Sequence, residues 1–427
     1  MSINLAALKG DGGPRDEVPA RPPPPSRRHT WLDALRGLAV LAVLFEHLLD
    51  PLFPEVRAAV SPWFDFGQYG VMVFFLVSGY VVPASLERRG SVSGFWIGRL
   101  FRLYPLWIVA AVAGTAFGLL RVYSELPVQL GEHPAASGLA HLTMLQDFMQ
   151  VVSVVNVFWT LSYEMVFYLL VTAIFVLSPH RPRTTGTLVV LMAAVLVGGL
   201  LPAGALSRGL GGDAVVLIVT AVLVAGLAAV LGGGHRVRLC GAAALAVLAV
   251  VLLGANSRIG AWQSLAIVAT MFAGTALHRL DQGQLHRSAR WAVGLVPVVC
   301  VGAALWFGPG WGMSDGQALA FRWSWSAAVA AAWLTFFAFR LLRRPSALLV
   351  RLGLISYSVY LLHPLAVQVL RRLVPYPGEV PVTGRITWSL VLGAVVVAVA
   401  TATYRFVELP AQALGRRLVR ARAGVSP

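Results

Sequence analysis

Apolar stretches about as long as a bilayer is thick recur along the whole chain, separated by short polar segments. Crossing a bilayer as an α-helix takes roughly 17–25 predominantly apolar residues. Twelve such stretches centre near residues 35–49, 70–86, 103–121, 157–177, 186–203, 214–232, 238–254, 262–278, 291–307, 321–341, 352–370 and 386–407. Glycines and prolines occur within and between them, as is common in membrane helices. The pattern predicts an all-α fold, a polytopic transmembrane helix bundle of about 10–12 helices.

Composition and charge support a membrane protein and argue against nucleic-acid binding. Of the 427 residues, 58% are hydrophobic and 12% are charged, against about 25% charged in soluble proteins. The net charge is +16, but most of the 34 basic residues flank apolar stretches, where they act as topology signals and contact anionic lipids. With the N-terminus in the cytoplasm, 24 of them lie on the cytoplasmic side and 8 outside. We therefore expect both termini in the cytoplasm of a bacterium, and a multi-pass protein of its cell membrane.

The chain divides into three parts by composition. Residues 1–30 are predicted to be a disordered, basic, proline-rich leader, residues 31–410 the membrane domain, and residues 411–427 a basic cytoplasmic tail. The longest loop, near 122–156, contains "HLTMLQDFMQ", which we expect along the surface. The two cysteines, Cys240 and Cys300, lie in apolar stretches without the spacing of a disulfide framework or a metal site. We expect no metal.

The first apolar stretch, "LRGLAVLAVLFEHLL", contains three polar side chains, Arg36, Glu46 and His47. A charged residue at the bilayer centre costs roughly 2.5–3.5 kcal/mol, so such residues are functional-site candidates. Arg36 and His47 are eleven residues apart, which is about three helical turns or about 16 Å. Both side chains therefore face the same way, with Arg36 near the cytoplasmic mouth and His47 deeper in the membrane.

Other stretches place polar groups at similar depths. Glu164 in "VFWTLSYEMVFYLL" and His363 in "ISYSVYLLHPL" are expected to converge with His47 on one buried level. Arg99 and Arg102 in "GRLFRLYP" lie at the cytoplasmic entrance, and arginine binds phosphate in a bidentate manner. The arrangement predicts a tunnel in which arginines hold an anionic carrier while a histidine meets its reactive end. A thioester on a long flexible arm fits that geometry.

The motifs together resemble the acyltransferase-3 family of integral membrane O-acyltransferases. The matching stretches, in order over about residues 32–410, are "LDALRGLAVLAVLFEH", "GVMVFFLVSGYVV", "GRLFRLYPLW", "FWTLSYEMVFYLL", "LGLISYSVYLLHPL" and "YRFVELP". The resemblance implies transfer of an acyl group, by default acetyl, from cytoplasmic acyl-CoA to a hydroxyl of a glycan, glycolipid or secondary metabolite. It implies no permanently bound cofactor.

The resemblance also assigns roles to residues. The family's arginine-to-histidine pair corresponds to Arg36 and His47, its double-arginine motif to Arg99 and Arg102, and its acidic residue to Glu164. Arg36, Arg99 and Arg102 would bind the phosphates of acyl-CoA. His47 would act as general base on the acceptor hydroxyl or accept the acyl group transiently. Glu164 would orient His47 or balance its charge.

Tyr357, Tyr360 and His363 are expected to line the acceptor side. Simpler interpretations stay open for several of these residues. In these interpretations, His47 is a hydrogen-bonded packing histidine, and Arg36 anchors its helix at the membrane interface. The His363-Pro364 pair then only bends its helix. The sequence leaves the acceptor, the acyl length and the oligomeric state open.

A secondary transporter or flippase for an anionic lipid-linked substrate would also need many helices and buried charges. Transporters commonly contain inverted repeats with broken helices in matching halves. The sequence has no internal repeat, and its polar motifs gather in the first four stretches and the eleventh. This asymmetry favours the enzyme.

Overall fold

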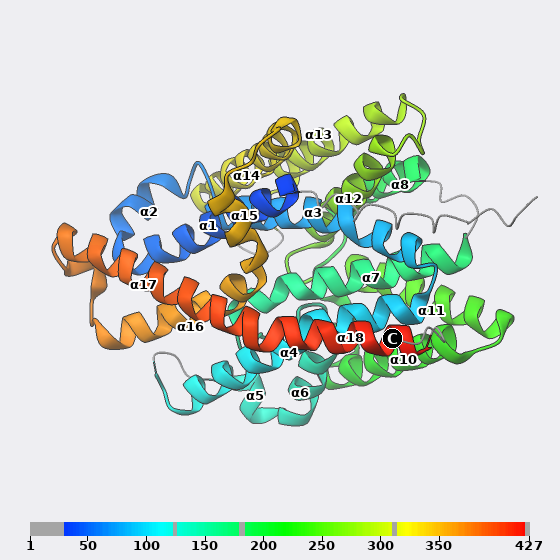
Figure 1. Ribbon diagram of the computed structural model, residues 1–427, viewed down its shortest axis with the longest axis horizontal. Coiled ribbons are helices and arrows are strands. Elements are labelled where there is room, and N and C mark those ends of the chain that lie inside the picture. The colour runs from blue at the N-terminus through cyan, green and yellow to red at the C-terminus, as the bar shows by residue number, and fades with distance from the viewer. Residues whose placement is uncertain (1–29, 123–125, 179–183, 310–313, 423–427) are drawn as a thin grey trace, which may run out of the picture.

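The computed structural model describes residues 30–122, 126–178, 184–309 and 314–422, and these residues form a helix bundle with no β-strand (Figure 1). The first half contains α1 (Thr30–Leu52), α2 (Pro54–Val60), α3 (Phe66–Arg89), α4 (Val92–Leu119), α5 (Val128–Glu132), α6 (Pro134–Thr143), η1 (Gln146–Met149), η2 (Asn156–Phe158), α7 (Trp159–Leu177) and α8 (Thr184–Gly198). The second half contains α9 (Ala205–Leu210), α10 (Gly212–Gly232), α11 (His235–Ala255), α12 (Ala261–Asp281), α13 (Ala289–Phe307), α14 (Asp315–Leu341), α15 (Ala347–Leu354), α16 (Ser356–Leu373), η3 (Pro377–Glu379), α17 (Val382–Thr403), η4 (Tyr404–Glu408) and α18 (Leu409–Arg422). The all-α prediction is confirmed, and each of the twelve apolar stretches overlaps a helix.

Eight of the described helices are long and apolar enough to cross a membrane, judged by length and composition. A ninth span is added if α15 and α16, which meet at a bend of 72°, count as one. α8 is apolar but has only 15 residues. α1 falls outside the group because it carries four charged residues, Asp33, Arg36, Glu46 and Asp50. The described part of the chain is thus a polytopic bundle in which α1 is set apart by its charged residues.

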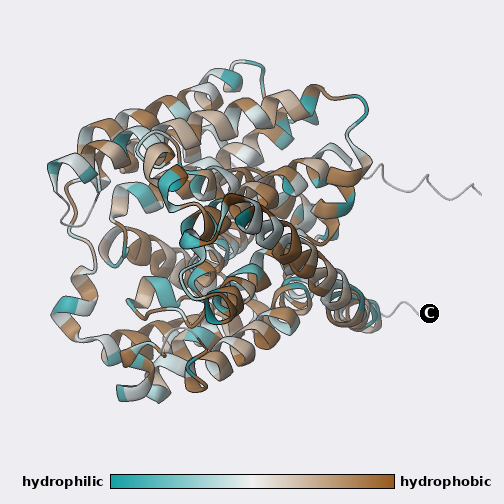
Figure 2. Cartoon of the chain, turned by 90° about the vertical axis from the view of Figure 1, so that its left-hand side faces the viewer, coloured by the Kyte–Doolittle hydropathy of each residue, from teal (hydrophilic) through white to brown (hydrophobic). Residues whose placement is uncertain are grey.

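Large apolar side chains also cover the outside of the bundle. Figure 2 shows hydrophobic residues in brown along many helices, including those at the periphery of the bundle. Leu119, Trp306 and Leu341 are among the large apolar side chains that lie exposed there. A surface of this kind is stable when hydrocarbon rather than water surrounds it.

The centre of the bundle is built on close backbone contact between α3 and α12. A Cβ atom on Gly79 would overlap the backbone carbonyl of Met271, and a Cβ on Gly274 would overlap that of Leu76. Thr275 Oγ1 donates a 3.0 Å hydrogen bond to the carbonyl oxygen of Gly79. Small residues permit such close approach of membrane helices. Gly79 and Gly274 are therefore packing positions at the centre of the bundle.

The segment "HLTMLQDFMQ" does not lie along the surface as predicted. Met144, Leu145, Phe148 and Met149 are fully buried in the bundle. Met144 and Gln150 adopt left-handed backbone conformations, with φ of 55° and 61°, and these turns fold the segment inward. The sequence pattern identified an apolar segment in a loop but did not show which way it turned.

The C-terminal part of the chain is a long helix that crosses the whole molecule. α17 continues through the π-helical turn η4 into α18, and together they run diagonally across Figure 1. α18 packs against the first half of α4. Residues 411–422 of the predicted tail are therefore helical and attached to the bundle, while 423–427 and the leader up to residue 29 lie outside the described residues.

Candidate active site

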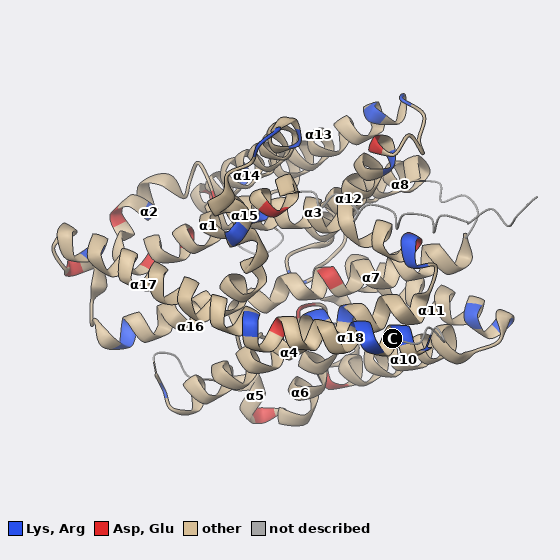
Figure 3. Ribbon diagram, in the orientation of Figure 1, with Lys and Arg blue, Asp and Glu red and all other residues tan. Residues whose placement is uncertain are grey.

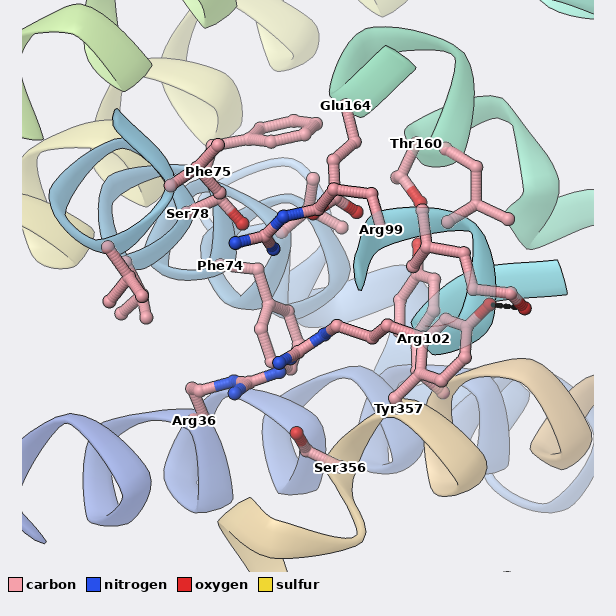
Figure 4. Close-up of a pocket in the computed structure, with 17 residues that line it drawn as sticks. Arg36, Phe74, Phe75, Ser78, Arg99, Arg102, Thr160, Glu164, Ser356 and Tyr357 are labelled. Atoms are coloured by element: carbon pink, nitrogen blue, oxygen red, sulfur yellow. Dashed lines mark hydrogen bonds between the residues drawn. The ribbon is translucent and has the colours of Figure 1, made fainter. Parts of the chain in front are cut away.

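Three arginines meet in one cavity of about 100 Å³, here called the arginine cavity (Figure 4). Arg36 reaches it from α1, and Arg99 and Arg102 reach it from α4. Residues of α3, α7 and α16 complete the wall. The structure therefore brings together all three side chains that the sequence predicts as a phosphate-binding set.

Local contacts hold these arginines in place. Arg99 Nη2 donates a 2.9 Å hydrogen bond to Ser85 Oγ, and its guanidinium lies 5.4 Å from the ring centres of both Phe95 and Tyr168. In Figure 4, Arg36 and Arg102 extend toward each other beneath Phe74. Cation–π contacts keep a guanidinium oriented without neutralising it, so the cavity stays positively charged.

Glu164 on α7 is the acidic residue of the arginine cavity. It accepts a hydrogen bond from the hydroxyl of Tyr168, one turn further along the same helix. It lines the wall opposite the one from which Arg36 projects (Figure 4). The structure thus places Glu164 with the arginines, whereas the sequence led us to expect it beside His47 and His363.

His47 lines a second cavity, of about 470 Å³, here called the histidine cavity. Charged residues surround it. Glu46 and Asp50 of α1 form ion pairs with Arg57 of α2, and Asp50 also pairs with Arg371 of α16. No sequence motif marks Arg57 or Arg371 as a cavity residue.

His47, which is partly exposed, packs against the fully buried His363. Their ring centres are 4.6 Å apart at an interplanar angle of 76°. His47 Nδ1 lies 2.9 Å from the carbonyl oxygen of Val43, and His363 Nδ1 lies 3.1 Å from that of Val359. Because a carbonyl only accepts hydrogen bonds, each Nδ1 carries the proton, which leaves the lone pair of a neutral ring on Nε2. His47 lines the cavity, while His363 is fully buried behind it.

The two cavities are separated by Val71 and Tyr360, which line both of them. The ring of Tyr360 lies 5.8 Å from that of Phe74 on the arginine side and 5.9 Å from that of His363. Tyr357 lines only the arginine cavity and donates a 2.8 Å hydrogen bond to the carbonyl oxygen of Leu103. The three residues predicted for the acceptor side are therefore not together. Tyr357 lines the arginine cavity, Tyr360 lies between the two cavities, and His363 is buried behind the histidine cavity.

A polar cavity of about 570 Å³ adjoins the histidine cavity. The two share several lining residues, namely Asp65, Gln68, Asn156, Trp159 and Gln368. Asp147 and Gln263 also line the polar cavity, and each has a buried side-chain oxygen without a hydrogen-bond partner among the described residues. Burial raises the pKa of Asp147 to about 6, against the opposing effect of Arg258, 3.7 Å away. Amides, carboxylates and indoles suit a ligand rich in hydroxyl groups.

Within the described ranges, no three His, Cys, Asp or Glu side chains gather closely enough to hold a metal ion. The expectation that the reaction needs no metal stays a prediction.

The helical membrane fold, the arginine cavity and the adjacent histidine define a class of membrane-embedded group-transfer proteins, and comparison with known sequences narrows it. A family model described as an acyltransferase domain matches residues 29–405. The chain belongs to this family, the acyltransferase-3 family. This membership favours the enzyme over the transporter.

Several named proteins are similar to parts of the chain. Acyltransferase MdmB of Streptomyces mycarofaciens is 31% identical over 34% of this chain and 39% of its own length. A protein of Staphylococcus aureus (strain COL), named as an O-acetyltransferase, is 37% identical over 21% of this chain and 14% of its own. Nodulation protein 10 of Rhizobium leguminosarum bv. viciae is 29% identical over 40% of this chain and 52% of its own length. The chain thus spans about half or less of each relative, and no solved structure matches it.

Proposed function

We propose that the protein is a membrane O-acyltransferase that moves an acyl group, by default acetyl, from acyl-CoA to a hydroxyl of a glycan, glycolipid or small-molecule metabolite. The observation that carries the proposal is the proximity of two cavities. Three arginines line one cavity, and His47 lines the next, with Val71 and Tyr360 between them. The name of the Staphylococcus aureus relative supports an acetyl group and an oxygen acceptor.

The arginine cavity supplies the donor site in this proposal. Arg36, Arg99 and Arg102 bind phosphates of acyl-CoA through charge-assisted hydrogen bonds. The pantetheine arm then extends toward His47, about 16 Å further along α1. Glu164 limits the excess positive charge of the cavity and holds its shape through Tyr168.

His47 performs the proton transfer. Its Nε2 takes the proton of the acceptor hydroxyl as the oxygen attacks the thioester carbonyl, which forms the C–O bond. The C–S bond then breaks, and the imidazolium returns the proton to the leaving thiolate, so that CoA leaves as a thiol. In the alternative path, Nε2 attacks the carbonyl and the C–S bond breaks, so that CoA leaves as a thiolate. The acceptor hydroxyl then displaces Nε2 from the acyl carbon, and its proton passes through the imidazole to the thiolate. His363 positions the His47 ring in both paths.

The orientation in the membrane follows from charge. The last turn of α3 carries Arg88 and Arg89, and it lies at the same end of the bundle as the arginine-rich end of α18 (Figure 3). By the positive-inside rule we infer that this end of the bundle faces the cytoplasm, which is the orientation expected from the sequence. Acyl-CoA then enters from the cytoplasm of the bacterial cell, and the polar cavity beyond His47 receives the acceptor.

Comparing wild type with His47→Ala in membranes tests the proposal. Radiolabelled acetyl-CoA is followed into cell-envelope and small-molecule fractions, with His286→Ala, an exposed histidine outside both cavities, as the matched control. We expect label in one fraction with wild type and His286→Ala, and none with folded His47→Ala. Equal labelling by all three proteins would remove His47 from the reaction. The labelled fraction identifies the acceptor class.

A further inference from the structure

A second basic site lies beside the arginine cavity, in a groove of about 470 Å³ between the first half of α4 and α18. We call it the α18 groove. Figure 3 shows arginines gathered along these two helices. Six arginines line it: Arg89, Arg99, Arg102, Arg416, Arg420 and Arg422. Its lining contains no Asp or Glu, and none of the six forms an ion pair within the part of the chain that the structure describes.

Glycines allow the two helices to approach each other. A Cβ on Gly415 would lie only 2.8 Å from the Cβ of Phe101, and a Cβ on Gly94 would lie 3.4 Å from a methyl group of Val419. Arg89 Nη1 donates a 2.9 Å hydrogen bond to the carbonyl oxygen of Gly94. The groove is therefore a packed feature of the fold, in which both walls are held in contact.

The groove is continuous with the proposed donor site. Arg99 and Arg102 line both the α18 groove and the arginine cavity. A ligand bound by these two arginines can therefore extend in both directions. The arginine cavity is narrow, at about 100 Å³, and suits an extended arm, whereas the groove has room for a larger group.

The chemistry of the groove fits a phosphorylated nucleoside. Six guanidinium groups without a carboxylate require an anion with several charges, and guanidinium recognises phosphate in a bidentate manner. The N-terminus of α4, with Ser91 and Ser93, opens into the same groove and adds unpaired backbone N–H groups. Ile97 and Val419 provide apolar surface for a flat base.

We propose that the α18 groove binds the 3′-phosphorylated adenosine diphosphate end of acyl-CoA, so that the C-terminal helix is a donor-binding element of the enzyme. The assignment rests on the proposed function, because it requires acyl-CoA as the donor. Anionic lipid headgroups offer the same phosphate chemistry at a membrane surface. The base and the 3′-phosphate distinguish the nucleotide from a lipid.

The test measures binding of CoA and of CoA lacking the 3′-phosphate to the full-length protein in nanodiscs of neutral phosphatidylcholine. The variant is Arg416→Gln/Arg420→Gln. The control is Arg405→Gln/Arg417→Gln, which removes the same charge from exposed positions of the same long helix outside the groove. We expect the variant to bind CoA at least tenfold more weakly than wild type and the control, and to lose most of the preference for the 3′-phosphate.

Three results would overturn the assignment. Equal CoA affinity in variant and control would show that α18 does not contact the nucleotide. Unchanged CoA affinity with weaker binding to vesicles that contain phosphatidylglycerol would make the groove a lipid headgroup site. If the wild-type protein binds no CoA, either in phosphatidylcholine nanodiscs or in membranes that contain phosphatidylglycerol, acyl-CoA is not the donor and the proposed function is wrong. Measurement of the melting temperature of each protein separates these outcomes from loss of folding.

Discussion

At the scale of single residues, the two paired histidines have different proposed roles: His47 reacts, and His363 positions its ring. Only His47 lines the cavity, and His363 supports its ring from behind. We expect His363→Phe, which keeps a ring at this place, to lower kcat by less than about tenfold and to leave KM for the donor unchanged. His363→Ala removes the support and should lower kcat further. Steady-state kinetics of both variants beside His47→Ala provides the measurement. If His363→Phe were as inactive as His47→Ala, the His363 nitrogen would take part in the reaction.

Asp147 gives a prediction on pH. Its pKa is raised to about 6 from the ordinary 3.8 because it is buried. The folded protein therefore binds more protons than the unfolded chain between about pH 4 and 6. This carboxyl lowers stability as pH rises through that window, by up to roughly 3 kcal/mol for two pKa units. Asp147→Asn removes the ionisation, so its melting temperature relative to wild type should rise from pH 4 to pH 7. A difference that stays constant with pH would contradict the pKa assignment.

The residues of the site were predictable to different degrees. The spacing of Arg36 and His47 on one helix, and of Arg99 and Arg102 on another, was enough to predict which way their side chains point, and the structure brings the three arginines into one cavity. Arg57, Asp65 and Asp147 come from short helices, turns and loops whose placement depends on tertiary packing. No local pattern marks them as cavity residues.

At the scale of helices, the contact between α3 and α12 is one of the closest backbone contacts among the described residues. A methyl group on Gly79 would overlap backbone atoms of α12, which cannot move independently of the helix. We expect Gly79→Ala to reduce the yield of folded protein severely, or to lower its melting temperature by many degrees. Gly393→Ala on α17 is the matched control, since a Cβ there meets open space and alanine favours a helix by up to about 1 kcal/mol. Size-exclusion profiles and thermal unfolding in detergent check both variants, and a stable Gly79→Ala protein would show that the two helices can separate.

Helices were more predictable than their packing. Twelve apolar stretches predicted helices because a bilayer leaves few other ways to satisfy the backbone. The same stretches did not predict that residues 144–149 fold into the core, or that α18 binds along α4. Both features depend on turns and on glycine contacts between segments far apart in the sequence.

At the scale of the whole molecule, the order of the sites matters most. The α18 groove, the arginine cavity, the histidine cavity and the polar cavity each share lining residues with the next. A donor held at one end and an acceptor at the other would meet at the partition formed by Val71 and Tyr360. Movement of the acyl group past Val71 and Tyr360 therefore links donor binding in the arginine cavity to acyl transfer at His47.

A larger side chain at Val71, between the arginine and histidine cavities, should impair acyl transfer without impairing CoA binding. Val71→Phe adds a ring where the arginine and histidine cavities meet, so we expect CoA affinity to stay within about threefold while turnover falls at least tenfold. Val250→Phe, on the exposed face of α11, is the matched control and should leave both unchanged. Titration with CoA and single-turnover transfer of radiolabelled acetyl groups measure the two quantities in the same preparation. Equal loss of affinity and turnover would place the partition within the donor site itself. Normal turnover in Val71→Phe would show that the acyl group reaches His47 by another path.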